Sequence, residues 1–366
     1  MLEKVMALLL AVGAVGVCAG CGTTSSHYLY ATVPNQNQVL AYREDPNSGV
    51  LTEITGSPYA VGDGANSIVL HPSGNFAYVA NPGQQENDIS LFDINRNGGY
   101  LTEIPPRTTV EPATLPEFLA MDPSGAFLYA ADAGTYDISS FSIDSSSGAL
   151  TPVSGSPFLI GQSPLSIALT PGGNFLYVGI GGVGTRDGFI YGFSVNAGVL
   201  TSIGTFDSGG SNPNALAVDP TSSYLYVANS ASNSVAIYTI SSTGLLGPVS
   251  GSPLNDGYTT PNFLILDPAG KFLYVADQGS NNVAAFTITN GLPTALTTST
   301  TSNAYSTEKG PTVLAMDPNG KYLFVGNQGG GAGIQSFSID TNSSITLTPL
   351  FTYGVGNTVS SIAVLQ

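Results

Sequence analysis

The chain has 366 residues and a formal net charge of −16, with only eight Lys and Arg residues. This deficit of cations argues against a nucleic-acid-binding protein, which needs a basic surface to displace phosphate counterions. Charged residues make up 9% of the chain and Gly and Pro are abundant, so long exposed helices are disfavoured and short strands joined by turns are favoured.

The first 21 residues predict an export signal. Lys4 precedes an apolar run, residues 5–17, that is too short to span a bilayer. Ala19-Gly20-Cys21 then resembles the lipobox of bacterial lipoproteins, although Cys18 stands where leucine is usual. The resemblance implies cleavage before Cys21 and lipidation of that residue, which would anchor the protein stably in a membrane. A plain secretory signal is the alternative.

An anchored chain would lie outside the cytoplasm, in the cell envelope. Gly22 after the cysteine favours the outer membrane if the cell has two membranes. Residues 22–26 would then form a short tether, and we expect His27, next to it, to be exposed.

One aromatic position recurs along the rest of the chain. It lies in short apolar runs such as 127–130 and 272–275, which are typical of strands buried on both faces. Successive positions are 48, 51, 48, 49, 48 and 50 residues apart. The seven residues are Tyr30, Tyr78, Tyr129, Tyr177, Tyr226, Tyr274 and Phe324.

Each repeat predicts four strands. In each repeat a first apolar segment ends in a turn, such as Asp-Pro-Asn-Gly at 317–320. The segment with the recurring aromatic residue is the second, and a third and a fourth strand-like segment follow it. Seven such units predict an all-β, seven-bladed β-propeller over residues 27–366. The chain starts on a second strand and ends on a lone first strand, 361–365, so we expect this last strand to close the ring in the first blade. An open solenoid or β-helix is the alternative, which the long period disfavours.

The body of the chain offers little catalytic chemistry. His27 and His71 are its two histidines, and the two cysteines lie at positions 18 and 21. His71 stands where other repeats have the turn-opening aspartate, so we expect it to cap a turn. No Ser-His-Asp triad, Cys-His dyad or multi-histidine zinc site is indicated.

The inner strands of a propeller begin at one mouth of its central channel. The position five residues before the turn aspartate lies at the start of each inner strand, so we expect the seven residues at this position to form a ring at that mouth. Glu117 is the only acid of the ring; with Asn214 and Asn262 it predicts either a site for a hard cation such as Ca²⁺ or a general base. A polar ring hydrated by channel water is the alternative. The ring comprises Asn66, Glu117, Leu165, Asn214, Asn262, Thr312 and Ser360.

The loops after the second strands should share this face. An Asn or Asp follows the aromatic strand in five repeats, which favours turn capping over ligand binding. From these loops we take Asp132 and Asp137 as further mouth residues. Arg186 lies in a longer glycine-rich loop and is the candidate for holding a substrate carboxylate or phosphate; an ion pair with Asp187 is the alternative.

The segments 267–277 and 317–327, Asp-Pro-x-Gly-x-Phe/Tyr-Leu-Tyr/Phe-Val-Ala/Gly-Asp/Asn, resemble the seven-bladed lactonase family, which includes propeller-type 6-phosphogluconolactonases. Similar strand patterns occur in YVTN-type surface propellers. The resemblance implies hydrolysis of a lactone or related ester by residues at the channel mouth, with no cofactor required. It also implies a histidine before an inner strand and several cations near the channel, where this chain has Glu117, Asn214 and Asn262.

Two functions follow from these patterns. In the first, the protein is an extracytoplasmic lactonase with Glu117 as base or metal ligand and Arg186 as substrate contact. In the second, it is a non-catalytic surface propeller that binds an envelope protein or glycan. In both cases we expect a monomer whose contact with the membrane is its lipid anchor.

Overall fold

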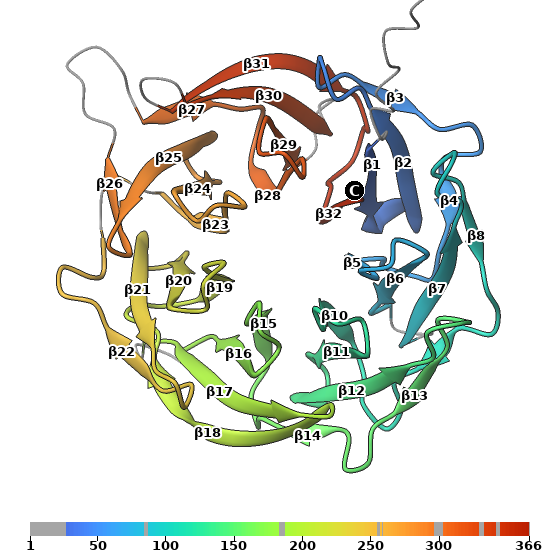
Figure 1. Ribbon diagram of the computed structural model, residues 1–366, viewed down its shortest axis with the longest axis horizontal. Helices are drawn as coiled ribbons and strands as arrows, with labels where there is room; N and C mark the ends of the chain where they lie inside the picture. Colours follow the sequence, from blue (N-terminus) through green and yellow to red (C-terminus); the bar gives the residue numbers. More distant parts are fainter. Residues whose placement is uncertain are drawn as a thin grey trace, which may run out of the picture.

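The chain forms a ring of seven antiparallel sheets around a central axis (Figure 1). The computed structural model describes residues 27–83, 87–182, 187–254, 257, 259–295, 303–328, 333–341 and 345–365. The predicted all-β, seven-bladed propeller is therefore confirmed. Within the described part of the chain, no helix has the length and apolar character needed to cross a membrane.

The strand bounds follow the predicted repeats, with each blade numbered by its place along the chain. Blade 1 joins β1 (His27–Val33), β2 (Gln38–Glu44), β3 (Leu51–Glu53) and β4 (Tyr59–Ala60) to β32 (Ser361–Leu365), with a 3-10 turn, Pro34–Gln36, after β1. Blade 2 holds β5 (Ser67–Leu70), β6 (Phe76–Asn81), β7 (Asp88–Ile94), β8 (Leu101–Glu103) and β9 (Thr108–Thr109). Blade 3 holds β10 (Pro116–Met121), β11 (Phe127–Asp132), β12 (Asp137–Ile143), β13 (Leu150–Pro152) and β14 (Phe158–Leu159).

The remaining blades repeat this order from the axis outward. Blade 4 holds β15 (Pro164–Leu169), β16 (Phe175–Ile180), β17 (Phe189–Asn196) and β18 (Val199–Asp207). Blade 5 holds β19 (Pro213–Val218), β20 (Tyr224–Asn229), β21 (Ser234–Ile240) and β22 (Leu246–Pro248). Blade 6 holds β23 (Pro261–Leu266), β24 (Phe272–Asp277), β25 (Asn282–Thr289), β26 (Leu292–Ala295) and β27 (Ala304–Ser306). Blade 7 holds β28 (Pro311–Met316), β29 (Tyr322–Asn327), β30 (Ile334–Asp340) and β31 (Thr346–Tyr353).

The last strand closes the ring as predicted. β32 pairs antiparallel with β1, from Tyr28 opposite Leu365 to Thr32 opposite Ser361. Figure 1 shows it as the innermost strand of the blade that the amino-terminal strands begin. Both ends of the described chain therefore share one sheet, and β32 completes the first blade by taking its innermost position.

Buried apolar side chains pack between neighbouring blades rather than in one central core. Each of seven clusters joins residues of two adjacent blades; one contains Tyr30 and Phe92 of blades 1 and 2, and another contains Ala31 and Phe324 of blades 1 and 7. The seven recurring aromatic residues are all fully buried. Burial on both faces explains why these strands are continuously apolar in sequence.

The turns between first and second strands use the predicted side-chain caps. Asp267 accepts backbone N–H bonds from Lys271 and Phe272 at 2.6 and 2.7 Å. The predicted capping role of His71 is confirmed, since its Nδ1 accepts the backbone N–H of Ser73 at 3.1 Å. Its Nε2 lies 3.0 Å from the carbonyl oxygen of Gly125 in the next blade.

The expectation that His27 is exposed is wrong. His27 is 5% exposed because it is the first residue of β1, directly opposite Glu44 of β2, and is covered by blade 7. Its proximity in sequence to the predicted tether carried no information about this packing.

Candidate functional site

The mouth of the channel is built by a repeated irregularity at the start of the inner strands. In blades 3 to 7 the register against the second strand shifts between a proline and the residue two positions later, as between Pro116 and Phe118. The residue inside this bulge is in every case a member of the predicted ring, such as Glu117 in blade 3. Bulges re-aim side chains, so the five ring positions of blades 3 to 7 are set by the backbone of their own blade.

Asparagine side chains hold these strand entries in place. Two residues before Glu117, Leu115 has a left-handed backbone with φ of 58°, and its N–H donates to Oδ1 of Asn87 in blade 2 at 2.8 Å. Thr260, with φ of 58°, bonds in the same way to Asn233 of blade 5. A left-handed non-glycine residue costs of order 1–3 kcal/mol and persists only where its surroundings over-determine it.

The same contact joins blades 1 and 2 and blades 6 and 7. Gly64 N–H donates to Asn37 at 2.9 Å and Gly310 N–H donates to Asn281 at 2.7 Å. Sequence patterns alone did not single out Asn37, Asn87, Asn233 and Asn281. The available signal was an Asn just before the third strand of these repeats, where all four adopt positive φ.

The ring borders a cavity of about 560 Å³ on the axis. Its lining mixes amide and hydroxyl groups with apolar surface, and the lining residues that the structure describes include no charged side chain. Phe118 and Phe263, each directly after a ring position, also face the cavity and were missed in the sequence. The ring residues in the lining are Asn66, Leu165, Asn214, Asn262, Thr312 and Ser360.

Glu117 is half-buried and is not among the residues that line the cavity, but it is held by one of them. Its Oε2 accepts a hydrogen bond from Nδ2 of Asn66 at 2.8 Å, and Asn66 also reaches the backbone oxygen of Glu117 at 3.1 Å. Burial raises the pKa of the Glu117 carboxyl, and the Asn66 hydrogen bond partly offsets that rise. A carboxylate with a raised pKa is a better proton acceptor than an ordinary surface glutamate.

Three other polar ring residues form a separate chain of hydrogen bonds. Nδ2 of Asn214 donates to Oδ1 of Asn262 at 2.9 Å, and Nδ2 of Asn262 lies 3.4 Å from the Thr312 carbonyl oxygen. Thr312 in turn donates to the Val359 carbonyl oxygen at 2.6 Å. Leu165 lies between Glu117 and Asn214 in the order of the blades. The structure therefore brings together two of the three predicted Ca²⁺ ligands, Asn214 and Asn262, and pairs the third, Glu117, with Asn66.

Asp132 and Asp137 also come together, but between strands rather than in the cavity lining. They are opposite each other at the ends of β11 and β12, and both are buried. Burial raises the pKa of Asp132 to about 8, and a hydrogen bond in which Asp132 shares its proton with Asp137 adds to that rise. In blade 2 the equivalent positions hold Asn81 and Asp88, joined by an amide–carboxylate bond of 2.7 Å. Both pairs join adjacent strands, so the predicted turn capping does not describe them.

Two predicted functional residues lie outside the described residues. They are Arg186, the predicted substrate contact, and Cys21, the predicted lipidation site.

Comparison with known proteins agrees with this architecture. The family model for lactonases with a 7-bladed β-propeller matches residues 23–165, 161–256 and 256–360. A 6-phosphogluconolactonase of Bacillus subtilis is 30% identical over 129 residues, which is 34% of this chain and 36% of that protein. A 6-phosphogluconolactonase of Formosa agariphila is 33% identical over 100 residues, 27% of this chain and 28% of that protein. The matched segments thus span about a third of these relatives.

Solved structures share the whole fold at low sequence identity. A protein of Bacteroides fragilis has a TM-score of 0.79 at 19% identity, with 95% of this chain and all of that chain covered. The periplasmic gluconolactonase of Pseudomonas aeruginosa has a TM-score of 0.74 at 17% identity, with 93% and 99% covered. With the family match extending over nearly all of the described residues, the chain belongs to the family of seven-bladed β-propeller lactonases.

Proposed function

We propose that this protein hydrolyses a lactone without a phosphate group at the channel mouth, with Glu117 as general base. The observation that carries the proposal is the contact between Glu117, a half-buried carboxylate with a raised pKa, and Asn66, which lines the 560 Å³ cavity. Family membership supports the reaction class, although a fold alone does not define an activity.

The reaction needs one proton to be moved twice. Glu117 accepts a proton from a water molecule as that water adds to the lactone carbonyl carbon. Collapse of the tetrahedral intermediate breaks the bond to the ring oxygen, and protonated Glu117 returns the proton to this leaving oxygen. The products are a hydroxy acid and the regenerated carboxylate, so no metal or redox cofactor is required.

The lining favours a polyhydroxylated, uncharged substrate. Amides and hydroxyls of Asn214, Asn262 and Ser360 offer hydrogen bonds to sugar hydroxyls, and Phe118 and Phe263 offer apolar surface to a sugar ring. A phosphorylated lactone would meet a chain of net charge −16 and a described lining without Lys or Arg. The name of the Pseudomonas protein, a gluconolactonase, is consistent with this substrate class.

The test compares glucono-1,5-lactone with its 6-phosphate as substrates of wild-type protein and of two Glu→Gln variants. Glu117→Gln should lower kcat for the unphosphorylated lactone by about 10²- to 10⁴-fold, the usual contribution of a general base. Glu53→Gln, at an exposed position, should have wild-type activity. Equal activity of Glu117→Gln and wild type would refute the site.

The same assay distinguishes general-base catalysis from the two alternatives that the sequence leaves open, a Ca²⁺ site and a non-catalytic binding function. If Glu117, Asn214 and Asn262 instead bind Ca²⁺, activity will depend on added Ca²⁺ and fall with a chelator. If no lactone is hydrolysed, the non-catalytic binding function is favoured. Tyr136 and Leu159 of blade 3, 45% and 76% exposed, would then be the apolar surface to test for an envelope partner.

We also propose that the protein is exported and anchored to the membrane through Cys21. The support is the apolar segment and lipobox-like sequence at residues 5–21. Wild-type protein should be in the membrane fraction and label with a radioactive fatty acid. Cys21→Ser should remove the label, and retention of the label would contradict the assignment.

A further inference from the structure

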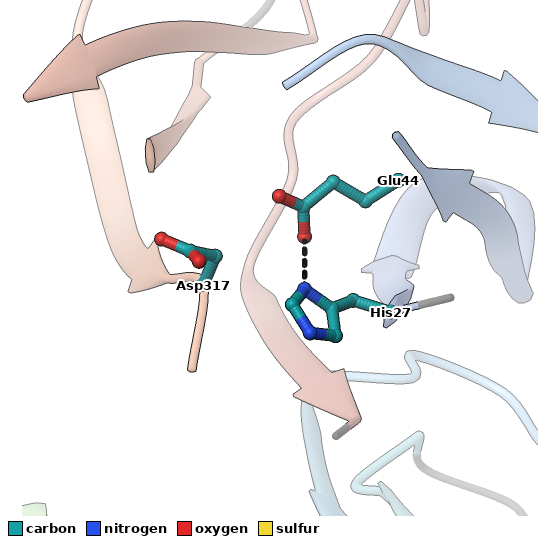
Figure 2. Close-up of side chains that lie close together, drawn as sticks. All are labelled: His27, Glu44 and Asp317. Carbon is teal, nitrogen blue, oxygen red and sulfur yellow. Dashed lines mark ion pairs between the residues drawn. The ribbon is translucent and has the colours of Figure 1, made fainter. Parts of the chain in front are cut away.

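Three side chains converge at the seam where the ring closes, away from the channel mouth. His27 begins β1, Glu44 ends β2, and Asp317 opens the turn between β28 and β29 of blade 7. Figure 2 shows the imidazole and the Glu44 carboxylate pointing at each other, with Asp317 beside them. One potential ligand atom from each lies within 4.8 Å of the other two.

The repeats show that Glu44 is exceptional at its position. It lies at the end of the third strand, opposite the leucine that begins the fourth strand, as Ile94 lies opposite Leu101 in blade 2. The other six blades have an aliphatic residue here: Ile94, Ile143, Val195, Ile240, Ile288 and Ile339. Blade 1 alone places a carboxylate there, with a side chain that is 0% exposed.

This carboxylate has His27 as an ion-pair partner but lacks the hydrogen bonds that a buried charge requires. Neither oxygen of Glu44 accepts a hydrogen bond from a described residue, and Nδ1 of His27 is likewise without one. The other charged groups acting on Glu44 are two acids, Asp317 and Asp45, so these neighbours add negative charge and supply none of the missing positive charge. A buried carboxylate without hydrogen bonds is costly, and one imidazole at 3.3 Å compensates it only in part, so a positive ion is the expected complement.

The spacing of His27 and Glu44 suits two ligands of a tetrahedral metal ion. Nδ1 of His27 lies 3.3 Å from Oε2 of Glu44, long for a charge-assisted hydrogen bond of about 2.7–2.9 Å. Two ligands about 2.0–2.1 Å from a tetrahedral zinc ion are about 3.3–3.4 Å apart. Asp317 supplies the third ligand. Its Oδ2 accepts one backbone N–H, from Asn319 at 3.0 Å, and keeps a lone pair that can bind a metal ion.

We propose that His27, Glu44 and Asp317 form a buried site for a divalent transition metal such as Zn²⁺, which ties the first blade to the last. One imidazole and two carboxylates suit Zn²⁺, and a fourth position would take water. Because Asp317 belongs to blade 7 and the other two ligands belong to blade 1, the metal stabilises the closed ring. This site is separate from the proposed lactonase site, so each can fail alone.

The experiment uses untagged full-length protein with Cys18 and Cys21 replaced by serine, so that no thiol competes for the metal. Protein from zinc-supplemented cells should contain about one zinc per chain, measured by inductively coupled plasma mass spectrometry. Chelation should lower the melting temperature by several degrees, and added Zn²⁺ should restore it.

Two variants and a control separate a metal site from general destabilisation. His27→Ala should lose the zinc and the response of the melting temperature to Zn²⁺. Glu44→Ile, which copies the other blades and so should fold, should also lose both. His71→Ala removes the other histidine, which is hydrogen bonded, and should keep one zinc per chain. Absence of zinc from the parent protein, or an unchanged zinc content in Glu44→Ile, would overturn the proposal.

Discussion

Two buried tyrosines at the same position of different blades should respond oppositely to removal of their hydroxyl groups. Tyr177 OH donates to the Gly244 carbonyl oxygen of the next blade at 2.8 Å, whereas Tyr129 OH has no hydrogen-bond partner among the described residues. The reason is local: Ser140, opposite Tyr129, donates to the Gly198 carbonyl oxygen at 2.7 Å and thereby takes the equivalent acceptor.

Tyr177→Phe should therefore destabilise the fold by about 1–2 kcal/mol, since it breaks a buried hydrogen bond and leaves a carbonyl unpaired. Tyr129→Phe removes an unsatisfied hydroxyl and should be neutral or slightly stabilising. Phe324 shows that blade 7 accepts phenylalanine at this position. The measurement is the thermal unfolding midpoint of the two variants and wild type, at one pH. Equal losses in both variants would refute the assignment of these hydrogen bonds.

Three further predictions test other parts of the account. The first concerns Asp132, whose carboxyl has a pKa of about 8 in the folded protein and near 3.9 in the unfolded chain, so its contribution to stability falls as pH rises between these values. The Asp132→Asn variant, which copies Asn81 of blade 2, should therefore melt at a higher temperature than wild type at pH 8 and differ less from wild type at pH 4. Deleting residues 359–366 removes the pairing of β32 with β1 and should leave aggregated protein; a truncated chain with the wild-type melting temperature would exclude the closure described above. Asn66→Ala removes the hydrogen bond that lowers the pKa of Glu117, so the rise of kcat/KM with pH should move to higher pH; an unmoved profile would separate Asn66 from the base.

The architecture was predictable because the repeat is strong. A recurring aromatic position, the turn residues and the split first blade together predicted seven sheets and the strand that closes them. The location of the ring residues at one mouth followed from strand direction alone. These features depend on patterns that extend along the whole chain, so a local departure such as His71 did not obscure them.

The pairing of side chains was less predictable. Strand order placed Glu117 in the ring, but its bond to Asn66 depends on a bulge that leaves no mark beyond Pro116. Asp132 and Asp137 were assigned to the mouth because their loop lies there, yet both side chains turn between the strands. Glu44 was missed although a comparison of third strands would have shown a carboxylate where six blades have an aliphatic residue.

The most direct test of the proposed site is a crystal structure of the Glu117→Gln variant soaked with glucono-1,5-lactone, because this variant should bind the lactone without turning it over. We predict the lactone in the channel cavity, with its carbonyl carbon next to residue 117 and its hydroxyls bonded to Asn214, Asn262 or Ser360. A lactone bound elsewhere, or a cavity filled only by water at saturating lactone, would contradict the assignment of the channel mouth as the active site.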